Sequence, residues 1–318
     1  MMDNVSQITM FFLSGLNETN NHRFTLFFLT LLCYCVILLV NISVIVTIIM
    51  DKNLHEPMYI LICAFSMNGL YVTTGFYPKF LWDLLSPVHV ISYSGCLVQA
   101  QVGGSYVASE LSILAVMAYD RYVAICRPLE YHSVMSQQRL ILLVCYSWMT
   151  PFCTIGISTF LTSRLKLCSP YIHKFFCVNW MIVKLACSPA QTRVNGIFVY
   201  IIIIVYLIHA LFIVLSYMYL IKTCSNSINN RAKFMQTCVP HLISLLIFLV
   251  TILFEIMIMR FDPNNFPQTF KNFVEIETLV IPPLINPLIY GFKLTKIRNR
   301  ILVVLTLKKK KKNPFVQY

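Results

Sequence analysis

Seven long apolar stretches, each carrying at most two charged residues, dominate this 318-residue sequence. A helix needs about 20 mostly apolar residues to cross the roughly 30 Å hydrocarbon core of a bilayer. Within that core a helix also satisfies its own backbone hydrogen bonds. The sequence therefore predicts an all-α membrane protein, a bundle of seven transmembrane helices forming one domain over residues 1–318. The predicted spans are 24–50, 58–78, 97–119, 140–163, 194–221, 238–259 and 272–292.

Composition excludes most other classes of protein. Hydrophobic residues make up 58% of the chain and charged residues 12%, against about 45–50% and 25% in soluble domains. This disfavours a cytosolic enzyme, a disordered chain and a small secreted disulfide protein. The sequence contains no Gly-rich phosphate loop, no HExxH, no Cys-x-x-Cys and no Gly-x-Ser-x-Gly. We therefore expect no enzyme activity, no cofactor and no metal site.

The basic residues set the orientation. If the N-terminus lies outside the cell, the inner connections hold 16 of the 25 Lys and Arg residues and the outer connections hold 9. This orientation agrees with the excess of Lys and Arg that cytoplasmic loops of membrane proteins carry. Two glycosylation motifs, at Asn4 and Asn17, precede the first span and also indicate an extracellular N-terminus.

The net charge of +13 is explained by a membrane surface and needs no nucleic-acid partner. The cytoplasmic tail, residues 293–318, holds nine Lys and Arg, and we expect Lys308–Lys312 to lie against anionic lipid heads. Apolar residues recur at helical spacing before this run and predict a short amphipathic eighth helix on the cytoplasmic surface. A solvated basic tail is the alternative. The apolar residues are Leu294, Ile297, Ile301 and Leu305.

Four of the 12 cysteines lie on the predicted outer side, where the compartment is oxidising and disulfides persist. Four cysteines permit three pairings, and their positions alone do not choose among them. Free thiols are the alternative. The four are Cys96, Cys168, Cys177 and Cys187.

The third span carries the most informative polar residues. Glu110 is a buried acid at mid-depth, and it precedes Arg121 by 11 residues, so the two lie on nearly one helix face beside Asp120. Intramembrane charges usually face the interior of a bundle. The residues above Glu110 are small and apolar, which leaves room either for another helix or for a ligand. They are Gly103, Gly104, Val107 and Ala108.

The seventh span contains three prolines, which remove backbone hydrogen bonds and predict a kink. Asn286 offers its amide to the freed carbonyls or to neighbouring helices, and with Tyr290 it forms a candidate two-state element. The prolines are Pro282, Pro283 and Pro287.

Other ionisable residues lie nearer the span ends. We expect Glu255, Glu275 and Glu277 to be solvated at the outer ends of their helices. His241, at the inner start of the sixth span, is interpreted as a packing residue rather than a pH-sensitive group.

Four motifs, in order and at the expected membrane depths, identify a family resemblance. The chain resembles the olfactory receptors, within the rhodopsin-like G-protein-coupled receptors, over nearly its whole length. The segment SMNGLY at Ser66–Tyr71 resembles the fish branch of that family. The four motifs are LHEPMY at Leu54–Tyr59, MAYDRYVAIC at Met117–Cys126, KFMQTCVPHL at Lys233–Leu242 and PPLINPLIY at Pro282–Tyr290.

The resemblance implies roles for many of these residues. It implies the disulfides Cys96–Cys177 and Cys168–Cys187. It implies that Asp120 holds Arg121 in the inactive state, and that a stimulatory G protein binds the opened inner face and raises cyclic AMP. The implied switch residues are Asp120, Arg121, Tyr122, Tyr217, Lys233, Asn286, Pro287 and Tyr290.

The resemblance also implies a small-molecule odorant bound in the outer half of the bundle, and a plasma-membrane location in the cilia of olfactory sensory neurons. The expected pocket residues are Gly103, Gly104, Val107, Ala108, Ile201, Val205, Leu249 and Ile256.

The chain departs from the pattern of the families it resembles at three positions. Gly69 stands where most rhodopsin-like receptors carry an Asp, which puts sodium binding in doubt and leaves Glu110 as the nearest carboxylate. Leu249 replaces a tyrosine common in olfactory receptors, and Gly103 replaces the Asp of amine receptors, which argues against an aminergic ligand. The alternatives are a seven-helix transporter or channel, which needs a continuous polar path, and a receptor of this family acting outside the olfactory organ.

Overall fold

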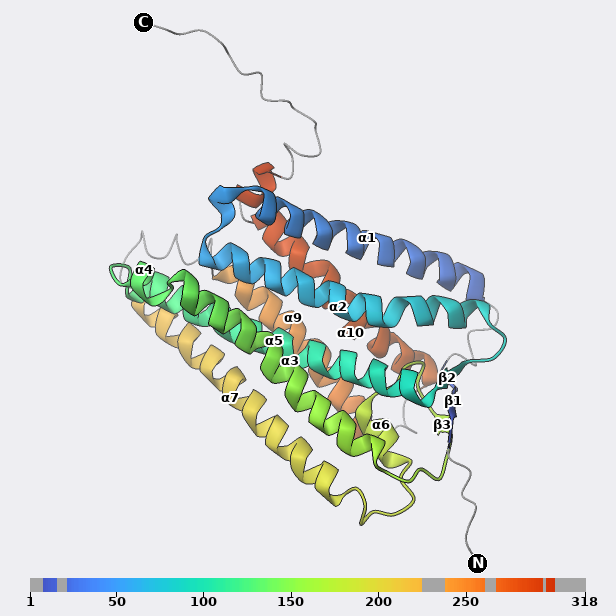
Figure 1. Ribbon diagram of the computed structural model, residues 1–318. Coiled ribbons are helices and arrows are strands. Elements are labelled where there is room, and N and C mark those ends of the chain that lie inside the picture. The colour runs from blue at the N-terminus through green and yellow to red at the C-terminus, as the bar shows by residue number, and fades with distance from the viewer. Residues whose placement is uncertain (1–7, 16–21, 225–237, 261–266, 294–295, 301–318) are drawn as a thin grey trace, which may run out of the picture.

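Long helices account for most of the described chain (Figure 1). The computed structural model describes residues 8–15, 22–224, 238–260, 267–293 and 296–300. Seven long helices correspond one to one with the seven predicted spans, so the predicted bundle is confirmed. They are α1 (Arg23–Met50), α2 (Pro57–Leu85), α3 (Tyr93–Cys126), α5 (Gln137–Ser163), α7 (Arg193–Cys224), α9 (Val239–Arg260) and α10 (Gln268–Lys293).

Within the described chain, six of these helices contain segments long and apolar enough to cross a membrane, and α9 adds the shorter apolar segment Val239–Glu255. Short helices occupy the connections: η2 (Lys52–Leu54), α4 (Tyr131–Val134) and α6 (Asn179–Lys184).

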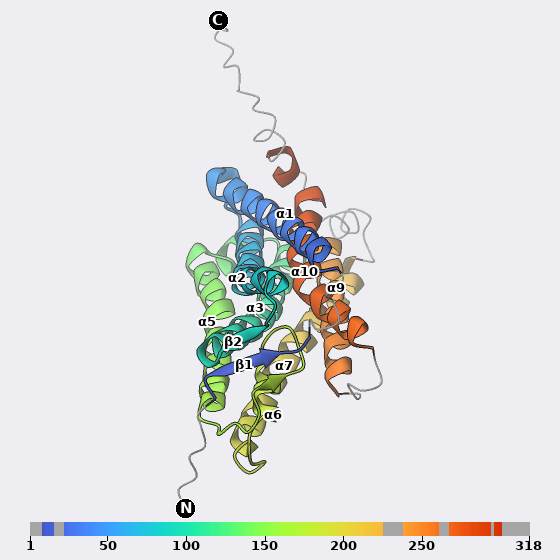
Figure 2. The same ribbon diagram turned by 90° about the vertical axis from the view of Figure 1, so that its right-hand side faces the viewer.

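Helix α3 lies at the centre of the bundle, packed against α2, α5 and α7, while α10 packs against α9, α1 and α2 (Figures 1 and 2). Most of α3 is buried, whereas α7 exposes large apolar side chains such as Ile204, Leu207 and Leu211. Exposed apolar surface of this extent is costly in water but not in lipid. The bundle is thus apolar on its outside as well as in its core, as a membrane protein must be.

Several helices extend beyond the predicted spans, because their ends are set by caps rather than by hydropathy. Ser92 caps the start of helix α3, because its Oγ accepts the backbone N–H of Gly95 at 3.1 Å. Helix α2 starts with Pro57 at its first position, where the missing N–H costs nothing. It continues past Pro78, the predicted end, to Leu85.

A small sheet at the outer end was not predicted (Figure 2). Strand β1 (Met10–Leu13) pairs antiparallel with β2 (Val90–Ser92) and parallel with β3 (Tyr171–Ile172), in the order β2-β1-β3. Side chains alternate across a strand, and accordingly Phe11 and Leu13 are buried while Met10 and Phe12 are exposed. The sheet fastens the N-terminal segment and the long outer loop to the start of α3.

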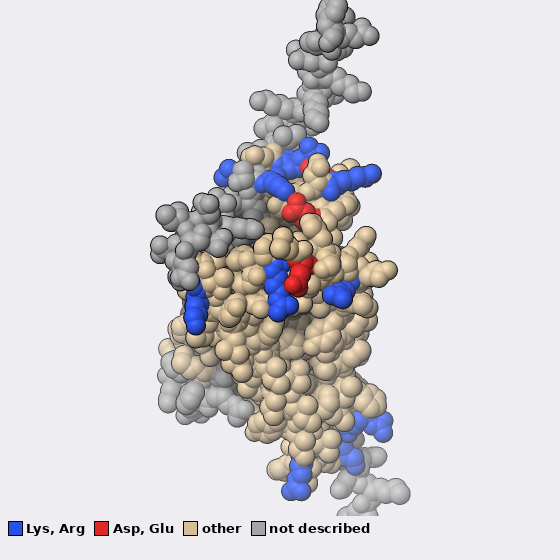
Figure 3. All heavy atoms as spheres, turned by 90° about the vertical axis from the view of Figure 1, so that its left-hand side faces the viewer, with Lys and Arg blue, Asp and Glu red and all other residues tan. Residues whose placement is uncertain are grey.

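The inner end carries basic side chains beside a few acidic ones (Figure 3). Residues 296–300 are helical, with Ile297 buried and Lys296 donating to Glu56 Oε1 at 2.9 Å. That contact raises the pKa of Lys296. The predicted amphipathic eighth helix is thus described over its first residues only, since 301–318 lie outside the described chain.

Candidate signalling site in the helix bundle

The inner end of α3 buries an ion pair. Arg121 Nε donates to Asp120 Oδ2 at 2.8 Å, and Arg121 Nη2 contacts the same oxygen. The second carboxylate oxygen, Oδ1, accepts the hydroxyl of Tyr131 at 2.8 Å. Asp120 is fully buried and Arg121 nearly so. Because both carboxylate oxygens are engaged, Arg121 and the loop helix α4 are held to the same acid.

Tyr131 contacts the pair in a way that the sequence analysis did not predict. It stands five residues after Cys126 in the recognisable motif region, but its position depends on the turn that leads from α3 into α4. Burial, and then the negative charge of Asp120, raise the pKa of Tyr131, so its hydroxyl stays protonated and donates.

Three of the other predicted switch residues, Tyr122, Tyr217 and Tyr290, lie toward the inner end of the bundle. Tyr217 on α7 and Tyr290 on α10 are buried, and the Tyr290 hydroxyl lies 3.3 Å from His241 Nδ1. This contact and its burial are compatible with His241 as a packing residue. Tyr122 is half-buried, with its ring 5.6 Å from that of Tyr219. Lys233 lies outside the described residues.

A second polar cluster surrounds Glu110 at mid-depth. Glu110 Oε2 accepts Asn68 Nδ2 and Oε1 accepts Asn286 Nδ2, both at 2.9 Å. The acid therefore joins α2, α3 and α10. Next to Asn286, Pro287 is buried, and the carbonyl of Pro283 accepts Asn41 Nδ2 at 2.8 Å. A proline at 287 cannot donate to the Pro283 carbonyl, so Asn41 from α1 uses an acceptor that the helix itself leaves free.

The predicted pocket residues on α3 divide into two groups. A Cβ added at Gly103 would meet no atom within 4 Å, so this glycine borders open space. A Cβ at Gly104 would come within 2.9 Å of Ile155 Cγ2, so Gly104 permits close packing of α5. Val107 and Ala108 pack into the apolar core. Helix packing therefore accounts for Gly104, while a ligand beside Gly103 stays a prediction.

The remaining pocket residues come from α7 and α9. Ile201 is exposed, with 51% of its surface accessible, and Val205 is half-buried. Leu249 packs partly buried against the core, and the side chain of Ile256 lies outside the described residues. The full set stays a prediction.

A buried ion cluster under the outer loop corrects one expectation. Glu255 and Glu275 were expected to be solvated, but Lys174 Nζ lies 2.8 Å from Glu275 Oε1 and 3.7 Å from Glu255 Oε1. Lys174 and Glu275 are almost fully buried. The reason is that the long outer loop folds inward after β3 and covers the ends of α9 and α10. Charges removed from water in this way require partners.

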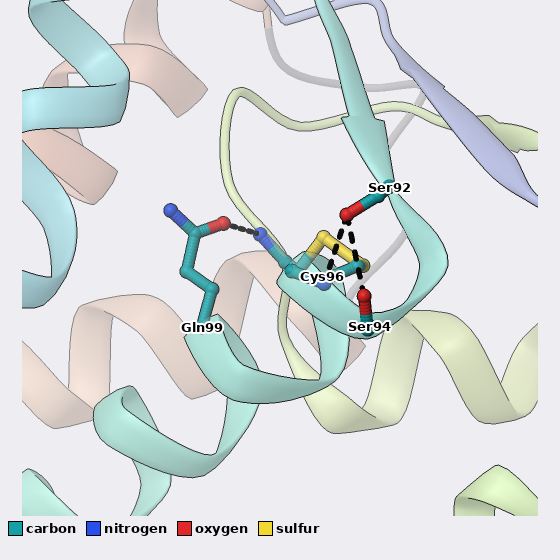
Figure 4. The surroundings of a disulfide bond; sticks show 6 residues. Ser92, Ser94, Cys96 and Gln99 are labelled. Carbon is teal, nitrogen blue, oxygen red and sulfur yellow. Dashed lines mark hydrogen bonds between the residues drawn. A yellow bond between two sulfur atoms is a disulfide. The ribbon is translucent and has the colours of Figure 1, made fainter.

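Two disulfides hold this loop, with the pairs that the resemblance implies. Cys96 at the start of α3 bonds Cys177, and Cys168 bonds Cys187. Figure 4 shows Gln99, one turn along α3, whose Oε1 accepts the backbone N–H of Cys177 at 2.8 Å. The sequons at Asn4 and Asn17 lie outside the described residues.

Together, seven apolar helices, a buried Asp-Arg pair at the inner end of the third and a disulfide from its outer end to the covering loop define a rhodopsin-like G-protein-coupled receptor. The olfactory receptor family model matches residues 30–309. The chain belongs to the olfactory receptor family, and the predicted odorant-sensing receptor is confirmed.

Relatives match over nearly the full length. Olfactory receptor 1D2 of Pan troglodytes is 33% identical over 91% of this chain and 92% of its own. Olfactory receptor 5AP2 of Mus musculus is 33% identical over 95% of each, and olfactory receptor 4B13 of the same species is 34% identical over 94% and 97%. Such relatives are receptors rather than enzymes, and with the membrane helices they support a multi-pass protein of the plasma membrane. Assignment to the fish branch stays a prediction.

Proposed function

We propose that a small odorant binds in the outer half of the bundle and opens the cytoplasmic face to a stimulatory G protein, which raises cyclic AMP, in the cilia of olfactory sensory neurons. The observation that carries this proposal is the contact of Arg121 with Asp120 and, through Asp120, with Tyr131. An arginine so held is unavailable to a partner, and release of the contact exposes a cation at the inner surface.

The energetic requirement on the odorant is modest. A ligand shifts an equilibrium only through its different affinity for the two states. An odorant that binds the open state tenfold better than the closed one shifts the equilibrium by about 1.4 kcal/mol. The expected odorant pocket and the Asp120–Arg121 pair both include residues of helix α3. Movement of α3, or of α7 and α9 against it, would therefore connect odorant binding to the ion pair.

A transporter or channel is the weaker candidate. Such a protein needs a continuous polar path through the membrane. Among the described residues, Glu110 is the charged side chain at mid-depth, and both of its oxygens are occupied by Asn68 and Asn286. A conduction path would have to open these contacts.

The test is cyclic AMP in cells that express the chain with a stimulatory G protein, across an odorant panel, in wild type and Arg121→Ala. Arg164→Ala, at an exposed arginine on the outer side, is the matched control. Surface expression is measured for all three. A dose-dependent rise in wild type and Arg164→Ala that is absent from Arg121→Ala supports the proposal. A full response in Arg121→Ala contradicts it, as does ion flux that is independent of guanine nucleotide.

A further inference from the structure

A groove on the membrane-facing side of the bundle belongs to neither the switch nor the expected odorant pocket. It measures about 650 Å³ and lies between α3, α5 and α7. Its rims are exposed apolar side chains, including Leu142 and Ile208, which are 68% and 61% accessible. Its volume falls within the range of small-molecule sites, about 300–1,000 Å³. In a bilayer such a groove is open to lipid.

The floor and the outer end of the groove explain its shape. Helix α3 contributes the floor of the groove, where the small side chains of Ser112 and Ala115 lie beside Val116 and Tyr119. At the outer end the Tyr146 hydroxyl lies 3.2 Å from His209 Nε2, which joins α5 to α7 and closes the groove. The groove therefore ends at this contact and extends toward the inner edge, where Val134 and Arg139 line it.

The polarity of the groove is equally uneven. His209 Nδ1 lies 2.8 Å from the carbonyl of Val205, and its Nε2 lies 3.2 Å from the Tyr146 hydroxyl, so both ring nitrogens have partners within the protein. The lining contains no Asp or Glu among the residues that the structure describes. Among the described lining residues Arg139 is the one Lys or Arg, and it stands near the start of α5, at the inner membrane edge.

Arg139 is available to a ligand. It is exposed and forms no ion pair with any residue in the described parts of the chain. It precedes Tyr146 by seven residues, or about 10 Å along α5 at 1.5 Å per residue. A cation at the inner edge and an apolar channel running about 10 Å inward match one kind of molecule, an amphiphile with an anionic head. The inner leaflet supplies anionic phospholipid at this position.

We propose that this groove binds one anionic phospholipid of the cytoplasmic leaflet, with its phosphate on Arg139 and an acyl chain between α5 and α7 as far as the Tyr146–His209 contact. Tyr119 also lines the groove and directly precedes Asp120. The bound lipid thus packs against the inner end of α3 and keeps α5 and α7 apart there.

Native mass spectrometry tests the proposal on the full chain, released from nanodiscs of phosphatidylcholine and phosphatidylserine. We expect wild type to retain one phosphatidylserine in preference to phosphatidylcholine. A near-surface Arg contributes about 1 kcal/mol to such binding, so Arg139→Gln should weaken it about fivefold. Ile208→Trp, at an exposed position, should fill the groove and weaken retention without disturbing the core. Arg298→Gln, at another exposed arginine of the inner side outside the groove, is the control and should retain the lipid.

Four results would overturn the proposal. Equal loss in Arg298→Gln and Arg139→Gln would show general attraction to basic residues. Undiminished retention in Ile208→Trp would place the lipid outside the groove. Preferential retention of phosphatidylcholine, or a dimer without bound lipid, would assign the groove a different occupant. Thermal unfolding of each variant verifies that the fold is intact, and no step of the test needs an odorant or a G protein.

Discussion

Substitution of Asp120 by Asn should raise basal signalling. The carboxylate accepts Arg121 through Oδ2 and Tyr131 through Oδ1. An amide keeps an acceptor for Tyr131 but loses the negative charge that holds the guanidinium. If the contact exists in the closed state alone, its loss acts entirely on the equilibrium between closed and open receptor.

The magnitude follows from the kind of hydrogen bond that is lost. Hydrogen bonds to charged groups contribute about 1.5–3 kcal/mol, so Asp120→Asn should raise the open-to-closed ratio roughly 10- to 150-fold. Tyr131→Phe removes one neutral donor and keeps the ion pair, so its effect should lie at the lower end, about tenfold or less. Helix α4 should then be freed while Arg121 remains paired.

Basal cyclic AMP, normalised to receptor at the cell surface and measured without odorant, gives the ranking Asp120→Asn above Tyr131→Phe above wild type. Glu130→Gln is the matched control, because Glu130 pairs with Arg127 across 3.8 Å at an exposed position where an ion pair contributes little. The idea that this pair holds the receptor closed would be refuted if basal signalling in Asp120→Asn were no higher than in wild type. This result counts only if surface expression and the odorant response of the variant are normal.

Three further predictions concern the outer side. Lys174→Met should lower stability by about 3–5 kcal/mol, since it removes the cation beside the buried carboxylate of Glu275 and the partly buried one of Glu255. Thermal unfolding in detergent should show this drop beside an unchanged Lys166→Met, and equal melting of the two variants would contradict the buried cluster. Cys168→Ser opens a disulfide across 19 residues and should cost about 3 kcal/mol, so an unaltered melting temperature would argue against that bond. Asn4→Gln and Asn17→Gln should each remove one glycan and lower the apparent mass stepwise; a wild-type mass insensitive to glycosidase would contradict an occupied extracellular N-terminus.

The sequence predicted the helices well because the bilayer dictates their length and polarity. The third span illustrates both the success and its limit: residues 97–119 were expected, and α3 runs from Tyr93 to Cys126. The extra turns are amphipathic or polar and depend on local caps such as Ser92, which hydropathy does not detect. The outer sheet was missed for a related reason. Strand β1 is four residues long, and its partners come from the distant segments β2 and β3.

Individual polar residues were predictable, but their partners were not. Glu110 and Asn286 are conspicuous because polar groups at membrane depth are costly and therefore rare. Their hydrogen bond joins positions 176 residues apart, and only the packing of α3 against α10 brings them together. The burial of Lys174 was still harder to predict from the sequence, because a lysine in a long outer loop is ordinarily solvated. Its burial depends on how the loop folds across α9 and α10.

Two helices carry these polar contacts in the same arrangement, which bears on how the two ends of the bundle communicate. On α3, Glu110 and Arg121 are 11 residues apart; on α10, Glu275 and Asn286 are also 11 apart. This spacing is close to three turns, or about 16 Å, so each pair lies on one face of its helix. Glu110 bonds Asn286, and thereby fastens the middle of α3 to α10. We expect a displacement of α10 where Glu275 meets the outer loop to reach α3 through the buried contact between Asn286 and Glu110. Because packed interiors resist continuous deformation, such contacts favour two discrete states over a graded response.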